Sequence, residues 1–188
     1  MRVGIADHLG WAVAVTATAD HRVVDRRRIT LVEPEMTPAP IHYESHRLDV
    51  AATAALVAEV RASVARAAST ALDQIAATLA VPIMSISLRA WPLDFPDDIA
   101  VQRRSPYEAR ADAIMYRQIL SELAHARGYH VHLYDAKKVE AQAVTILAER
   151  AEEVLNSPRV VLGRPWAKDH RIALAATIVG GLDLSRNG

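Results

Sequence analysis

The sequence predicts a single α/β domain built on a mixed sheet, and three observations carry that prediction. Three consecutive strand-like segments occupy the first 33 residues, and the segments after them alternate between helix and strand. Consecutive strands joined by short turns form antiparallel hairpins, whereas a helix between two strands indicates a parallel crossover. A chain of 188 residues with 51% hydrophobic residues is also long and apolar enough for one complete core. We therefore expect one domain spanning 1–188.

The N-terminal hairpin is the clearest local signal. An apolar run ends at Asp7, the segment His8-Leu9-Gly10 predicts a tight turn, and a second apolar run starts at Trp11. A third strand follows the turn at Ala19-Asp20. Its Arg26-Arg27-Arg28 run either contacts phosphate or charges an exposed edge against sheet-to-sheet association, and the edge interpretation is favoured. The three predicted strands are 2–7, 11–18 and 21–33.

The rest of the chain alternates between helices and strands. Segment 34–48 contains three prolines and predicts an irregular connection. Asp49 predicts the N-cap of a long helix with one apolar stripe, and Ser105-Pro106-Tyr107-Glu108 predicts a helix start with a capping box. Asp135 predicts a cap for the helix after it. The predicted helices are 49–79, 105–127, 136–155 and 168–180, and the predicted strands are 81–88 and 129–134.

Composition and charge narrow the class of protein. Lys and Arg number 22 and Asp and Glu number 22, so the formal net charge is zero. Proteins that bind nucleic acid without sequence preference usually show a basic excess, so only a local basic patch is compatible with these numbers. The absence of cysteine excludes disulfides, thiolate metal sites and a cysteine nucleophile. No apolar run approaches the roughly 18 residues of a membrane span, and no signal peptide is recognisable, so we expect a cytoplasmic protein without membrane contact.

Familiar catalytic motifs are missing from the sequence. It contains no Gly-rich phosphate loop, no Ser elbow and no dinucleotide fingerprint, which disfavours ordinary NTPases, hydrolases and dehydrogenases. Arg103 and Arg104 precede a predicted helix N-terminus, where free N–H groups favour anions, and we expect both to bind phosphate. Trp91 and Trp166 lie in predicted loops, where they either stack on a base or cover the core.

Two stretches resemble the Holliday-junction resolvases. Gly4-Ile5-Ala6-Asp7-His8-Leu9-Gly10 is similar to their first strand, which is apolar, ends in Asp and leads into a Gly-containing turn. The stretch Lys168-Asp169-His170-Arg171-Ile172-Ala173-Leu174-Ala175-Ala176 is similar to their last helix, where acids precede an Ala-Leu-Ala run. The order of elements resembles the ribonuclease H-like superfamily over most of the chain. This resemblance implies a five-stranded mixed sheet in the order 3-2-1-4-5 with helices on both faces.

The resemblance also implies a chemistry. In that family, clustered carboxylates hold divalent metal ions that activate water and stabilise the leaving oxygen during phosphodiester cleavage. Matched residue by residue, Asp7 takes the place of the strand-1 acid and Asp169 that of the first acid of the last helix. The resemblance therefore implies that both are catalytic and bind Mg²⁺ or Mn²⁺, with His170 as a further ligand. Lys168, next to Asp169, is expected to meet phosphate.

The chain departs from the family pattern at two positions. The strand at 81–88 offers only Ser85 and Ser87 where the family has an acid, and Ile172 stands where the last helix carries its second acid. A carboxylate from the loop at 94–98 is the remaining substitute. Asp7 also fits a role in closing the turn, and Asp169 fits a simple helix N-cap.

Two functions therefore stay open from the sequence. The first is a nucleic-acid-associated protein of resolvase type that uses Mg²⁺ or Mn²⁺. The second is a non-catalytic ribonuclease H-like fold that acts as a homo-oligomeric interaction or regulatory module. The predicted fold and the Asp7 and Asp169 pair favour the first function, whereas the neutral net charge and the missing acids favour the second.

Overall fold

A five-stranded sheet forms the centre of the computed structural model, which describes residues 1–186 and the side chains of residues 1–182. Positions 187–188 of the predicted domain lie outside the described residues. The strand order is β3-β2-β1-β4-β5, the order that the resemblance implied. Two antiparallel pairings join the first three strands, and two parallel pairings add the others. The strands are β1 (Arg2–His8), β2 (Trp11–Ala17), β3 (Val23–Thr30), β4 (Ser85–Arg89) and β5 (His130–Tyr134).

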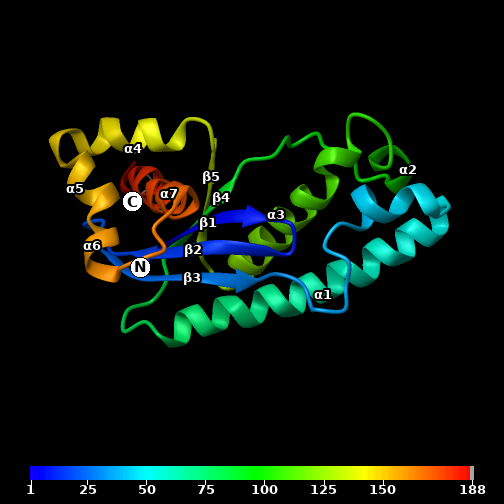
Figure 1. The fold of residues 1–188 in the computed structure, drawn as a ribbon, viewed down its shortest axis with the longest axis horizontal. Helices are drawn as coiled ribbons and strands as arrows, with labels where there is room; N and C mark the ends of the chain where they lie inside the picture. The colour runs from blue at the N-terminus through cyan, green and yellow to red at the C-terminus, as the bar shows by residue number, and fades with distance from the viewer. Residues whose placement is uncertain (187–188) are drawn as a thin grey trace.

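Helices cover both faces of this sheet (Figure 1). Helices α1 (Val50–Ala77) and α3 (Glu108–Ala126) pack on one face, and α7 (Lys168–Arg186) packs on the other beside α4 (Val139–Leu147). Within the described part of the chain, no helix is long and apolar enough to cross a lipid bilayer. The shorter helical segments are η1 (Pro40–Glu44), η2 (Ser45–Arg47), α2 (Ile99–Gln102), η3 (Ala148–Arg150), α5 (Ala151–Asn156) and α6 (Pro158–Leu162).

Strand β1 lies between two separate cores and divides its side chains between them. Val3 and Ile5 are buried in the core under α1 and α3, whereas Ala6 belongs to the core under α7. Gly4 lies on the α7 side as well, because a Cβ at this position would meet the carbonyl group of Ala173. Since successive residues of a strand point to opposite faces, Asp7 continues the α1 and α3 side of the strand.

The helix starts show where local signals suffice. Asp49 is the N-cap of α1 as predicted, and its carboxylate accepts the N–H of Ala52 at 2.7 Å. The capping box predicted for Ser105 and Glu108 is wrong. Helix α3 begins only at Glu108, and its N-cap residue, Tyr107, makes no side-chain cap. The preceding residues continue from α2 as turns, with the N–H of Tyr107 bonded to the carbonyl of Arg104 at 2.8 Å, so Ser105 does not stand at a helix start.

The helix predicted at 136–155 is interrupted in the structure. Helix α4 ends at Leu147, and Ala148 adopts a positive φ of 49° before η3 and α5 continue. This residue turns the chain, so α5 and α6 run along the side of the sheet (Figure 1). Trp166, which follows α6, is buried and donates its indole N–H to the carbonyl of Leu155 at 2.9 Å. Of its two predicted roles, Trp166 therefore has that of covering the core.

Candidate nucleic-acid interface

Asp7 lies near the C-terminal end of β1. Its carboxylate is the negatively charged member of a buried ion network with Arg117 and Arg89. Its side chain is 3% exposed, and the Nε–H of Arg117, on α3, donates to its Oδ2 at 2.8 Å. Arg89, the last residue of β4, places its Nε 3.9 Å from the Oδ1 of Asp7. Two guanidinium groups therefore face one carboxylate, and the carboxylate side of this network is almost fully shielded from water.

Tyr134, on β5, borders the same network. Its hydroxyl donates to the carbonyl of Ile5 at 2.7 Å, which links β5 to β1 across β4. Burial raises the pKa of the Tyr134 hydroxyl, and the nearby negative charge of Asp7 raises it further. The hydroxyl therefore keeps its proton and serves as a hydrogen-bond donor throughout the neutral pH range.

Asp169 belongs to a second group of residues, on the opposite side of β1. It lies in the first turn of α7, and its Oδ2 is 3.0 Å from the Nε2 of His8. The His8 ring stacks on Trp11 with 4.1 Å between ring centroids, and the Arg28 guanidinium lies 4.1 Å from the Trp11 ring centroid. Three adjacent strands thus present a stack of His8, Trp11 and Arg28 that ends on the Asp169 carboxylate.

His170 and Lys168, the two sequence neighbours of Asp169, lie in different environments. His170 is buried, its Nδ1 accepts the N–H of Ala167 at 3.2 Å, and its ring lies against Trp166. Burial, and then the charge of Arg26, lower the pKa of the His170 imidazole. His170 therefore supports the start of α7 as a neutral ring, whereas Lys168 is exposed and free to meet an anion.

This arrangement makes folding stability depend on pH. The pKa of His170 is lowered in the folded protein from its ordinary value of 6.5, so the unfolded chain binds the proton more readily. We expect the contribution of His170 to be complete above pH 6.5 and to be lost as the pH falls below that value.

The measurement is urea unfolding between pH 5 and pH 8 on the wild type and His170→Gln. Burial also lowers the pKa of His21, so both proteins keep that part of the pH dependence. The difference between them isolates His170, and parallel profiles would contradict the expectation.

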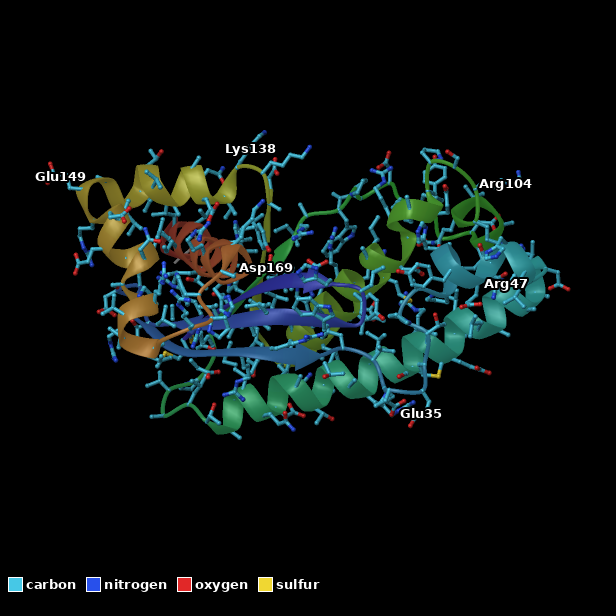
Figure 2. The ribbon with its side chains drawn as sticks, viewed as in Figure 1. Glu35, Arg47, Arg104, Lys138, Glu149 and Asp169 are labelled. Atoms are coloured by element: carbon cyan, nitrogen blue, oxygen red, sulfur yellow. The ribbon has the colours of Figure 1, made fainter. Side chains whose placement is uncertain are left out.

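The two arginines expected to bind phosphate lie elsewhere. Arg103 donates to the backbone carbonyls of Ser45, at 2.6 Å, and of Leu48, so its guanidinium holds the connection before α1. Arg104 is exposed. Figure 2 places Arg104 beside α2, far from Asp169 at the start of α7. The structure therefore does not bring Arg103 or Arg104 together with the predicted acids.

The predicted metal ligands can be tested for fit to a divalent ion. Asp7 and Asp169 lie on opposite sides of β1, and each already faces a side chain of its own. In the part of the chain that the structure describes, no group of three His, Asp or Glu side chains is close enough to hold a metal ion. Since Mg²⁺ requires several oxygen ligands in octahedral geometry, these residues do not fit a preformed metal centre. The metal site on Asp7, Asp169 and His170 stays a prediction of the sequence.

The residues that complete both groups were missed by sequence reasoning. Arg117 and Arg89 carry no local motif, and only the fold brings α3 and the end of β4 to Asp7. For His8, Trp11 and Arg28 a signal was present. Because the residues of a strand alternate between its two faces, Asp7 and His8 lie on opposite faces of the sheet. Asp7 therefore cannot share a face with His8 and the residues of α7 that contact it. An acid at either neighbouring position, where the chain has Ala6 and His8, would face α7.

Among the comparisons with known proteins, only the comparison with solved structures gives matches. No protein-family model matches the chain, and no curated protein matches its sequence. Among solved structures, the chain is similar to T. thermophilus RuvC in complex with a Holliday junction substrate. The TM-score is 0.50 at 15% identity, over 100% of this chain and 95% of that one. A second Thermus thermophilus RuvC structure has a TM-score of 0.48 at 14% identity, over 99% of this chain and 96% of that one. The ribonuclease H-like fold that the resemblance implied is confirmed.

Proposed function

We propose that this chain is a nucleic-acid-binding protein with a resolvase-like fold that does not cleave DNA through a metal–carboxylate centre. The observation that carries the proposal is the charge arrangement at Asp7, where Arg117 donates to one carboxylate oxygen and Arg89 lies 3.9 Å from the other, so that two positive charges oppose the approach of a metal ion. A guanidinium neutralises the acid but does not act as a Lewis acid toward water or phosphate. The fold is thus retained while the cleavage chemistry is not supported.

Nucleic-acid binding is supported by the surface at the C-terminal end of β1. Trp11 is partly exposed between His8 and Arg28, and Lys168 is exposed beside Asp169. The faces of the Trp11 ring are covered by His8 and Arg28, so the outer plane of this stack is the Arg28 guanidinium. Guanidinium planes stack on bases, and Lys and Arg neutralise phosphates, so this combination suits a nucleic-acid strand. Ligands of open α/β sheets generally bind outside the carboxyl ends of the strands. The similar RuvC structure contains a Holliday junction, which makes a branched DNA the first probe to use.

The decisive experiment measures binding and cleavage on the same substrate. A fluorescent four-way DNA junction and a linear duplex of equal length are titrated with protein, once with EDTA and once with Mn²⁺. We expect binding of the junction in both buffers and no strand cleavage in either. Arg28→Ala and Lys168→Ala should each weaken binding and reduce the slope of log K against log salt by about one. Arg159→Ala, an exposed arginine of α6, is the matched control.

Each other outcome has a definite meaning. Cleavage that needs Mn²⁺ and disappears in Asp7→Asn would restore the metal-dependent nuclease. Failure to bind either DNA would reject the proposal and favour the non-catalytic homo-oligomeric module, for which sedimentation analysis of the oligomeric state is the next measurement. Equal loss in Arg159→Ala would show that binding follows overall charge and not the surface formed by His8, Trp11, Arg28 and Lys168 (the Trp11 surface).

A further inference from the structure

A pocket of about 320 Å³ lies at the other end of the sheet from Asp7. The turn between β2 and β3 forms one wall, and η3, α5 and α6 form the facing wall. Val154, Val161 and Leu162 give this facing wall an apolar surface, and Val161 is 79% exposed, an unusual exposure for a valine. The volume falls at the lower end of the range for small-molecule sites, which are concave, mostly apolar and carry a few polar groups.

His21 contributes an unusual polar group to this pocket. Its Nδ1 is buried without a hydrogen-bond partner in the described part of the chain. The residue adopts a positive φ of 72° in the turn between β2 and β3, where its N–H donates to the carbonyl of Thr18 at 3.1 Å. Burial, together with Arg2 and Arg150, lowers the pKa of the ring, while Asp20 opposes this effect. His21 therefore offers a neutral ring nitrogen with no partner inside the protein.

Positive charges act on the His21 ring and line the pocket beside it. Arg22 and Arg150 line the pocket, and among the described residues neither side chain makes a hydrogen bond or an ion pair. Arg2, outside the pocket lining, also acts on the His21 ring and adds a third positive charge. Asp20 and Glu153 also line the pocket and offset two of these charges. The balance favours an occupant with one negative charge over a polyphosphate or a metal ion.

We infer that this pocket binds a small monocarboxylate with an apolar body. The carboxylate lies between Arg22 and Arg150, and on binding the His21 ring turns so that its Nδ1–H, buried in the free protein, donates a hydrogen bond to the carboxylate. The apolar body lies against Val154, Val161 and Leu162. This site shares no residue with the Trp11 surface, so it does not depend on the proposed nucleic-acid function.

The test uses 3-phenylpropionate and its neutral analogue 3-phenylpropanamide on the full-length protein, with affinity measured by calorimetry and by NMR titration. We expect the carboxylate to bind at least tenfold more tightly than the amide and to shift the His21 ring nitrogen signals. Arg150→Gln should reduce carboxylate affinity at least tenfold without changing amide affinity. Val161→Asp should also reduce it, because the new charge repels the ligand and the position is already exposed.

Arg159→Gln, an exposed residue of α6 outside the pocket lining, is the control and should bind like the wild type. Thermal unfolding of each variant checks that the fold is intact. Equal affinity for acid and amide, an unchanged His21 signal, or the same loss in Arg159→Gln and Arg150→Gln would each overturn the inference. DNA binding by Arg150→Gln should stay at the wild-type level, which separates failure here from failure of the proposed function.

Discussion

Asp7→Asn should lower the free energy of unfolding by about 3–5 kcal/mol, the typical cost of removing one partner from a buried ion pair. The Asp7 side chain is 3% exposed and that of Arg117 is 11% exposed, so the guanidinium left behind cannot recover full hydration. The amide keeps the size of the carboxylate but supplies no charge opposite Arg117 or Arg89. The loss is therefore electrostatic, since no cavity is created.

The sign of this effect separates the two interpretations of Asp7. In a cluster of metal-binding acids the carboxylates repel one another without their ion, so neutralising one of them leaves stability unchanged or raises it. Urea unfolding in the presence of EDTA measures the difference directly. A more stable Asp7→Asn protein would contradict the ion network and restore the acidic cluster.

Two further variants control for charge and position. Asp169→Asn removes the same charge from a pair whose side chains are 39% and 30% exposed, so it should cost at most about 1 kcal/mol. Adding Arg117→Met to Asp7→Asn removes the stranded cation, and it should restore part of the stability lost in the single variant. Absence of any restoration would show that packing of Arg117, and not its pairing with Asp7, carries the effect.

Gly4→Ala should cost at least about 3 kcal/mol, at or above the upper end of ordinary overpacking. A Cβ at Gly4 would lie 1.9 Å from the carbonyl oxygen of Ala173 and 2.7 Å from its carbonyl carbon. Both atoms belong to the α7 backbone, which cannot turn aside as a side chain does. The added methyl group must push α7 away from β1 and open the core between them.

Gly181→Ala provides the matched comparison on α7. A Cβ there would meet the Arg2 guanidinium at 2.0 Å, the far end of a long and adaptable side chain. Replacing a helical glycine by alanine also adds up to about 1 kcal/mol of helix propensity. We expect this variant to lie within about 1 kcal/mol of the wild type in thermal unfolding. If Gly4→Ala unfolds like Gly181→Ala, the close contact between β1 and α7 is not a constraint on stability.

Local patterns predicted most of the elements because their signals are contained within a few residues. The hairpin of β1 and β2, the cap at Asp49 and the strand order that follows from the resemblance are all confirmed. The start of α3 was misplaced because Ser105-Pro106-Tyr107-Glu108 has the composition of a cap but continues the turns after α2. The break at Ala148 was missed because the composition of the surrounding stretch suits a helix throughout.

The candidate site likewise combines features that the sequence determines with contacts that only the fold creates. The sequence alone determined that an acid stands near the end of the first strand, that a second acid lies in the first turn of the last helix, and that no third acid stands on β4. Only the tertiary structure decided the partners of these acids, since Arg117 is 110 residues from Asp7 and His8 is 161 residues from Asp169. Contacts over such distances depend on how helices pack on each face of the sheet. One strand residue separates the two faces, and that single step placed Asp7 among arginines instead of beside Asp169.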